Sequence, residues 1–143
     1  QNYQKARELV QIKGVNVDGH TSGENTPLTD AAMRGDVCGT KFLIEELNAN
    51  PFASCDCPNH KTAWHYASEN GHVKVLEVLN STSKNEYGAR DVNIFDNRSY
   101  TPYDLAINED VRKYLASIGG KPASQVSKSN TKQLTPPNTL YLM

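Results

Sequence analysis

Apolar residues recur at helical spacing in three separate stretches of the chain. The first stretch carries Val37, Phe42, Leu43, Ile44 and Leu47, the second Val73, Val75, Leu76, Val78 and Leu79, and the third Val111, Tyr114, Leu115 and Ile118. Apolar positions three and four residues apart line one face of an α-helix, so each stretch predicts an amphipathic helix. Gly39 weakens the first of these helices, because glycine is a poor helix former.

Each apolar stretch follows a short segment that begins with a threonine. Thr62 follows Thr26 by 36 residues, and Thr101 follows Thr62 by 39 residues. Threonine is a good N-cap, and the prolines that follow Thr26 and Thr101 fit the first turn of a helix. We therefore predict a short helix after each threonine, ended in the first two segments by Gly35 and Gly71. The chain repeats a two-helix unit, and the closer spacing within the third unit indicates a terminal unit.

The repeated unit resembles the ankyrin repeat, whose pattern is roughly D-x-x-G-x-T-P-L-H-x-A-A-x-x-G, then a second helix and G-A-D-V-N. The residues at 96–102, Asp-Asn-Arg-Ser-Tyr-Thr-Pro, match the opening of a unit, and those at 88–93, Gly-Ala-Arg-Asp-Val-Asn, match its close. Residues 6–17 resemble the second helix and exit of a unit whose first helix is absent. Trp64 departs from the pattern, where leucine is usual.

This resemblance implies an all-α fold, an ankyrin-repeat solenoid of stacked helix–turn–helix units with hairpin-like loops and a polar C-terminal tail. We expect a repeat domain over 1–120, divided into a half repeat over 1–20 and repeats over about 21–56, 57–95 and 96–120. Residues 121–143 form the predicted tail. It is polar until Leu140-Tyr141-Leu142-Met143, an apolar end that could dock on the stack itself.

The composition favours some partners over others. Hydrophobic residues make up 37% of the chain, which suits a stack of small shared cores better than one large core. The formal net charge of −1 argues against nucleic acid and anionic membranes as partners. No apolar run approaches the length of a membrane helix, and the three cysteines cannot all pair within the chain, so we expect a cytoplasmic or nuclear protein.

In ankyrin stacks a partner protein usually binds the hairpin tips and the exposed side of the first helices, on the concave face. The resemblance places the following residues there: Asn25, Asp30, Met33, Arg34, Asn59, Lys61, Tyr66, Glu69, Asn70, Asn97, Arg98 and Tyr100. Among them Arg34, Tyr66, Arg98 and Tyr100 are the strongest candidates, because Tyr and Arg are enriched among the residues that dominate interface energies.

Enzymatic and metal chemistry find little support in the sequence. Cys55, Cys57 and His60 form the one candidate metal loop, but the Cys-x-Cys spacing is tighter than in zinc sites, and we expect free surface thiols and no metal. We find no phosphate loop and no activated nucleophile, and expect no cofactor. The family pattern assigns His65 a bond within its own turn. Asn93 and Thr135 are weak candidates for modification.

The sequence therefore predicts a non-catalytic protein–protein interaction module, a scaffold or adaptor whose partner it does not identify. Two alternatives remain open at this point: a regulatory or substrate-recruiting domain of a larger enzyme, and a small assembly chaperone that covers a client surface. Because fold does not determine function, these three hypotheses rest on the resemblance more than on any site.

Overall fold

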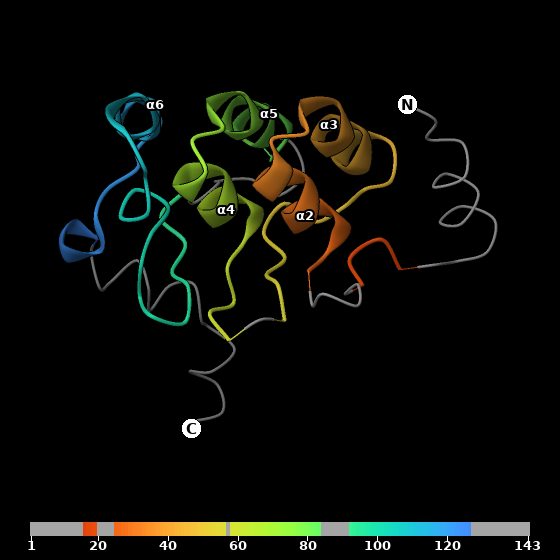
Figure 1. Ribbon diagram of the computed structural model, residues 1–143, viewed down its shortest axis with the longest axis horizontal. Coiled ribbons are helices and arrows are strands. Elements are labelled where there is room, and N and C mark those ends of the chain that lie inside the picture. The colour runs from red at the N-terminus through yellow and green to blue at the C-terminus, as the bar shows by residue number, and fades with distance from the viewer. Residues whose placement is uncertain (1–15, 20–24, 57, 84–91, 127–143) are drawn as a thin grey trace, which may run out of the picture.

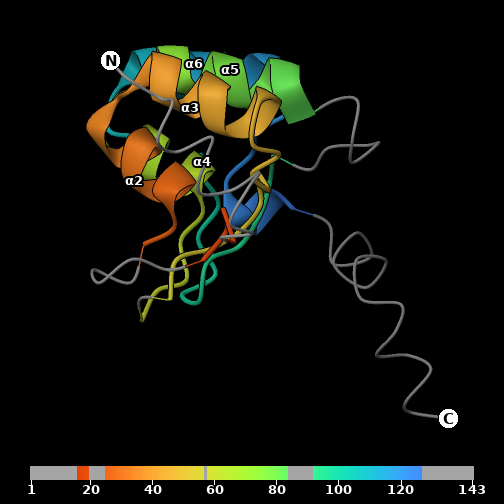
Figure 2. The same cartoon turned by 90° about the vertical axis from the view of Figure 1, so that its right-hand side faces the viewer.

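The computed structural model describes residues 16–19, 25–56, 58–83 and 92–126 of the chain. These residues form α2 (Pro27–Arg34), α3 (Val37–Glu45), α4 (Ala63–Glu69), α5 (Val73–Ser83), α6 (Glu109–Ser117) and the short 3-10 helix η1 (Ala123–Gln125). The helices lie in two layers, with α2 and α4 below and α3, α5 and α6 above, and the loops extend from the lower layer (Figure 1, Figure 2). Helix α2 packs on α4, and α3 packs on α5. In the described ranges the chain forms no strand, only an isolated bridge between Ser54 and Thr62, so the all-α solenoid is confirmed.

All three threonines donate their backbone amide to the side chain of the third residue after them. In the first unit the Thr26 Oγ1 accepts a hydrogen bond from the Thr29 amide at 3.1 Å, and the Thr29 Oγ1 accepts one from the Thr26 amide at 2.9 Å. This reciprocal pair satisfies two amides that the first turn of a helix leaves free. The third residue after the threonine is Thr29, His65 or Asp104 in the three units, and each accepts a hydrogen bond from the threonine amide. The N-cap positions predicted at Thr26 and Thr62 are therefore confirmed, whereas Thr101 begins a turn.

A continuous core runs between the helix layers. The side chains of Leu28 and Trp64, which occupy the same position in successive units, are almost fully buried together with Leu76, Leu79 and Leu115. The extra bulk of Trp64 is accommodated by Phe52, whose ring stacks on it with centroids 6.4 Å apart. The indole Nε1 of Trp64 is buried without a hydrogen-bond partner in the described structure. The tryptophan thus contributes through buried apolar area, not through its polar atom.

Two glycines are required by close contacts between elements. Gly35 ends α2 with φ +74°, and a Cβ there would lie 2.7 Å from the imidazole of His72, whose Nε2 donates to the Met33 carbonyl at 3.1 Å. Gly39 has a different function from the one expected. The carboxylate of Asp36 accepts the Gly39 amide at 2.9 Å and occupies the space that a side chain at 39 would need. Glycine therefore permits the N-cap of α3 here and does not merely weaken the helix.

The third unit differs from the prediction. Residues 101–107 do not form a helix; they make turns closed by the Leu105 amide on the Pro102 carbonyl and the Ala106 amide on the Tyr103 carbonyl. Helix α6 begins eight residues after its threonine, at Glu109, whereas α3 and α5 begin eleven residues after theirs. With three residues fewer, the segment has no room for a helix of the length of α2. The prediction of a helix over 101–108 was wrong.

Residues 119–123 close the last unit. The Thr101 hydroxyl donates to the Lys121 carbonyl at 2.7 Å, and the Ala123 amide donates to the Asp104 carboxylate at 3.0 Å. Asn93 adds two bonds, since its amide nitrogen donates to the Gly119 carbonyl and its oxygen accepts from the Lys121 amide. Lys121 and Ala123, which the prediction placed in the tail, are thus bonded to the stack. Most of the half repeat predicted over 1–20, the apolar end at 140–143 and Thr135 lie outside the described residues.

Candidate partner-binding face

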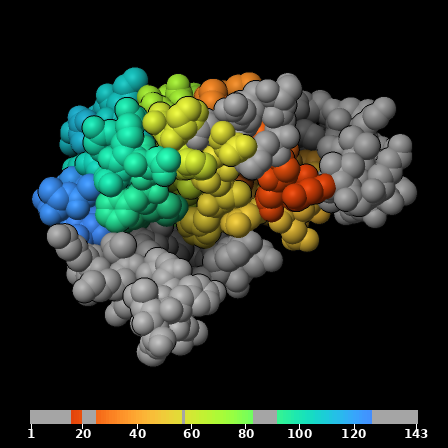
Figure 3. Space-filling view, turned by 90° about the horizontal axis from the view of Figure 1, so that it is seen from below, coloured from red at the N-terminus to blue at the C-terminus, as the bar shows by residue number. Residues whose placement is uncertain are grey.

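The candidate face consists of the hairpin tips and the outward sides of α2 and α4. In Figure 2 the loops project from beneath these two helices, and Figure 3 shows the second and third hairpins side by side from below. Of the twelve predicted residues, all of which lie in the described ranges, Arg34, Asn70, Asn97, Arg98 and Tyr100 are exposed, six are partly buried and Lys61 is buried. The face is therefore formed in part by side chains that already have partners within the chain.

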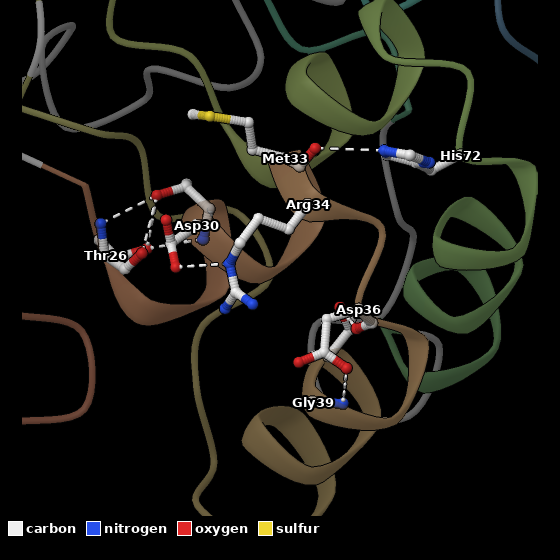
Figure 4. A network of polar contacts seen from close by, with 9 residues as sticks. Thr26, Asp30, Met33, Arg34, Asp36, Gly39 and His72 are labelled. Carbon is white, nitrogen blue, oxygen red and sulfur yellow. Dashed lines mark hydrogen bonds and ion pairs between the residues drawn. The ribbon is translucent and has the colours of Figure 1, made fainter.

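On α2 the two charged candidates neutralise each other. The Arg34 Nε lies 3.0 Å from a carboxylate oxygen of Asp30, one turn earlier (Figure 4). Both side chains are about half exposed, so this pair contributes little to stability. The backbone carbonyl of neighbouring Met33 accepts the bond from His72, which ties the end of α2 to the next unit. Asn25 is partly buried just before the N-cap.

On α4 the charged candidates are also paired. The Lys61 Nζ lies 2.8 Å from a carboxylate oxygen of Glu69 and 5.6 Å from the centre of the Tyr66 ring. Only 11% of the Lys61 side chain is exposed, which is why this residue supports the face and offers little to a partner. Asn70 donates its side-chain amide to the Tyr66 carbonyl at 2.9 Å and so caps the end of the helix.

Tyr66 is held at its ring and at its hydroxyl. The hydroxyl donates to the Cys55 sulfur at 3.4 Å, while the ring contacts Lys61. Burial, with the negative charge of Glu69 second, raises the pKa of Tyr66 above its ordinary value of 10.0. The side chain therefore stays a neutral phenol at physiological pH and serves as a hydrogen-bond donor within the chain.

The second and third hairpin tips are joined directly. The Asn97 amide donates to the Asn59 carbonyl at 2.7 Å, and the Asn97 side chain donates to the Pro58 carbonyl at 3.1 Å. Within the third hairpin one carboxylate oxygen of Asp96 accepts the amides of Arg98 and Tyr100, both at 2.9 Å. These backbone bonds fix the direction in which the two side chains leave the loop. The Arg98 guanidinium lies over the Tyr100 ring, 5.1 Å from its centre.

His65 links the second unit to the third hairpin. Its Nδ1 accepts from the Thr62 amide at 3.2 Å, and its Nε2 donates to the Tyr100 carbonyl at 2.9 Å. These two bonds together require the neutral ring with the proton on Nε2. Burial lowers the pKa of His65 below 6.5, although the Tyr100 carbonyl and Asp96 act in the opposite direction. The family pattern implied the bond of His65 within its own turn. The bond from His65 to Tyr100 leaves no signal in the sequence, because the acceptor is a backbone carbonyl 35 residues away.

The candidate metal loop needs a correction. Cys55 is buried and disulfide-bonded, so it is not the free surface thiol that we expected, and it has no thiolate to give to zinc. Its amide donates to the Lys61 carbonyl at 2.8 Å, which closes the hairpin and turns the sulfur inward to Tyr66. His60 is exposed at the hairpin tip, and Cys57 lies outside the described residues. No three His, Cys, Asp or Glu side chains of the described ranges are grouped as metal ligands would be.

Cys38, in α3, is free and exposed. Within the ranges described above, no helix is both long and apolar enough to cross a membrane.

Comparisons with known proteins agree with this geometry. A family model described as ankyrin repeats, in three copies, matches residues 1–91. A similar solved structure is the ankyrin repeat domain of Bcl-3, described as a unique member of the IkappaB protein family. The match has a TM-score of 0.71 and 22% sequence identity over 82% of this chain and 50% of that one, so this chain spans about half the length of the matched domain. A search of curated proteins returned no match.

The chain belongs to the ankyrin repeat family. Members of this family are in general modules for protein–protein interaction, without catalysis of their own.

Proposed function

We propose that this chain is a non-catalytic interaction module that binds a partner protein through its hairpin tips and the outward sides of α2 and α4. The observation that carries the proposal is the arrangement of Arg98 and Tyr100. Both side chains are exposed at a loop whose backbone is fixed by Asp96 and by the neighbouring hairpin. A rigid loop that presents Tyr and Arg loses little conformational entropy on binding.

The chemistry of the face also supports binding over catalysis. The carboxylates of Asp30 and Glu69 are held in ion pairs, and His65 is buried with both ring nitrogens engaged. His65 therefore has no ring nitrogen left to reach a substrate, as a general acid or base must. We therefore propose that the stack acts as a scaffold or adaptor, which binds its partner and does not modify it chemically.

The test compares capture from native cell extract by the full chain and by a triple variant, Arg34→Ala, Arg98→Ala and Tyr100→Ala. Tyr66 is left unchanged because its contacts with Lys61 and Cys55 make it part of the fold. A matched control, Lys41→Ala with Lys113→Ala, removes exposed cations from the outer helices α3 and α6. A protein retained by the wild type and the control but lost by the triple variant supports the face. Equal retention by all three chains would place the binding surface elsewhere.

A further inference from the structure

The three cations on the candidate face are not equivalent. Arg34 is paired with Asp30, and Lys61 is paired with Glu69 and nearly buried. Arg98 forms no ion pair in the described part of the chain, and its guanidinium contacts the Tyr100 ring. Asp96, the nearest carboxylate in sequence, is buried and turned to the backbone, where it accepts the amides of Arg98 and Tyr100. Asp56, exposed before the second tip, is not paired with Arg98 either.

The geometry around Arg98 leaves its hydrogen-bond donors available. A guanidinium that stacks on an aromatic ring uses its face for the ring, while the N–H groups at its edge point outward. Tyr100 is 42% exposed, one of the two large hydrophobic side chains with substantial exposure in the described structure. Together they offer an ionic and an apolar contact at the same place. The edge of a guanidinium can donate two parallel hydrogen bonds to one carboxylate, which makes the interaction directional as well as ionic.

The surroundings of Arg98 form a small rigid surface, which we call the hairpin ledge: residues 58–60 and 97–100. The Asn97 bonds to Pro58 and Asn59 join its two halves. His60 and Ser99 both have positive φ, 50° and 66°, at the tips of the two turns. The two tips adjoin in Figure 3. A segment lying across the ledge would meet a surface that does not need to be ordered first, which lowers the entropic cost of binding.

We propose that the hairpin ledge binds an acidic segment of a partner protein, with an Asp or Glu carboxylate on Arg98 and an adjacent apolar side chain on the Tyr100 ring. This proposal rests on the proposed function and names the chemistry of its partner. Charge complementarity selects the acidic segment, because no carboxylate among the described residues neutralises Arg98. Helices α2 and α4, whose charged side chains on this face are already paired, contribute shape and contact area to the interaction.

The experiment selects random linear peptides displayed on phage against the full chain, then measures the affinity of the enriched peptides in solution. The variants are Arg98→Glu, Arg98→Lys and the control Lys41→Glu, which changes net charge by the same amount on the exposed side of α3. We expect enriched peptides to share an acidic residue beside an apolar one. Arg98→Glu should lower their affinity about tenfold or more and reduce its salt dependence, whereas Lys41→Glu should leave both nearly unchanged.

Arg98→Lys keeps the charge but loses the stacked two-point geometry, so it should bind between the wild type and Arg98→Glu. When the Arg98→Glu variant is the target of the phage selection, the enriched peptides should carry a basic residue where the wild type selects an acidic one. Thermal unfolding of each variant checks that the fold is intact, which we expect because Arg98 is exposed and its backbone bonds do not involve the side chain.

The proposal of an acidic partner is refuted if the enriched peptides lack an acidic residue, or if Arg98→Glu does not change their affinity. Neither result contradicts the proposed function as an interaction module. Failure to enrich any peptide over an empty support would count against both proposals. The two failures are therefore distinguishable.

Discussion

His65 allows one prediction to be worked out in detail, namely that the stack loses stability as the pH falls below about 6.5. The side chain is fully buried between the second unit and the third hairpin, and its lowered pKa means that the folded state holds it neutral. In the unfolded chain the ring titrates near the ordinary value of about 6.5. Below that pH the unfolded state binds more protons than the folded state, so stability rises with pH there and falls with acid.

The geometry explains why the folded state resists the proton. Protonation would place a hydrogen on Nδ1, directly against the Thr62 amide that now donates to it at 3.2 Å. The bond from Nε2 to the Tyr100 carbonyl would survive, since a protonated ring still donates there. A single group whose pKa differs between the two states changes the free energy of unfolding by at most about 1.4 kcal/mol per pH unit. We therefore expect a loss of stability that is no larger than about 1.4 kcal/mol at about pH 5.5, one unit below the pKa of the unfolded chain.

The assay is urea unfolding across this pH range for the wild type and for His65→Thr. Threonine is the residue of the first unit at this position, where Thr29 bonds within its own turn. The variant should lose about 2–4 kcal/mol near pH 8, from the bond to Tyr100 and the volume of the ring. The other three histidines of the sequence are present in both proteins, so the difference between the two curves isolates His65. Parallel curves, or a wild type that gains stability in acid, would refute the reasoning.

Three further substitutions test other contacts. Ser99→Gly should stabilise the chain by about 0.5–1 kcal/mol in thermal unfolding, because Ser99 has φ +66° and an exposed side chain; a loss would show that the turn is not strained. Asp104→Ala should cost about 1–2 kcal/mol and speed hydrogen exchange of the Ala123 amide, which Asp104 binds; unchanged exchange would contradict that contact. Gly39→Ala should destabilise by about 1 kcal/mol by displacing the Asp36 cap, and should do so far less in an Asp36→Ala background; equal effects in both backgrounds would contradict the steric argument.

Local signals made most of the fold predictable. The threonines, the prolines after two of them and the glycines that end α2 and α4 act over a few residues, and the structure places caps and helix ends there. The prediction for the third unit failed because we interpreted its closer spacing as the mark of a terminal unit and not as a sign that a first helix has no room. Thr101 caps a turn as well as it caps a helix, and the early start of α6 decides between the two.

The candidate face was less predictable, because side-chain pairing across units is not encoded in any local pattern. Lys61 occupies a hairpin position that the family pattern treats as exposed, yet Glu69, two turns further on, draws it into an ion pair beside Tyr66. Arg34 and Arg98 are the same residue type, and only their surroundings distinguish them. Arg34 is neutralised by Asp30, whereas Arg98 lies on the Tyr100 ring. The sequence therefore proposes a set of residues, and the contacts rank them.

The contacts that hold the stack together are also those that position the hairpin ledge. The Tyr100 carbonyl accepts the His65 ring from the second unit, and the Asn97 amide reaches back to Asn59. Asp96 then fixes the amides of Arg98 and Tyr100 on the outer side of the same loop. A repeat stack gains stability chiefly from such contacts between neighbouring units. Because the same backbone segment takes part in both, the rigidity that stabilises the third unit is what presents Arg98 and Tyr100 to a partner in one fixed orientation.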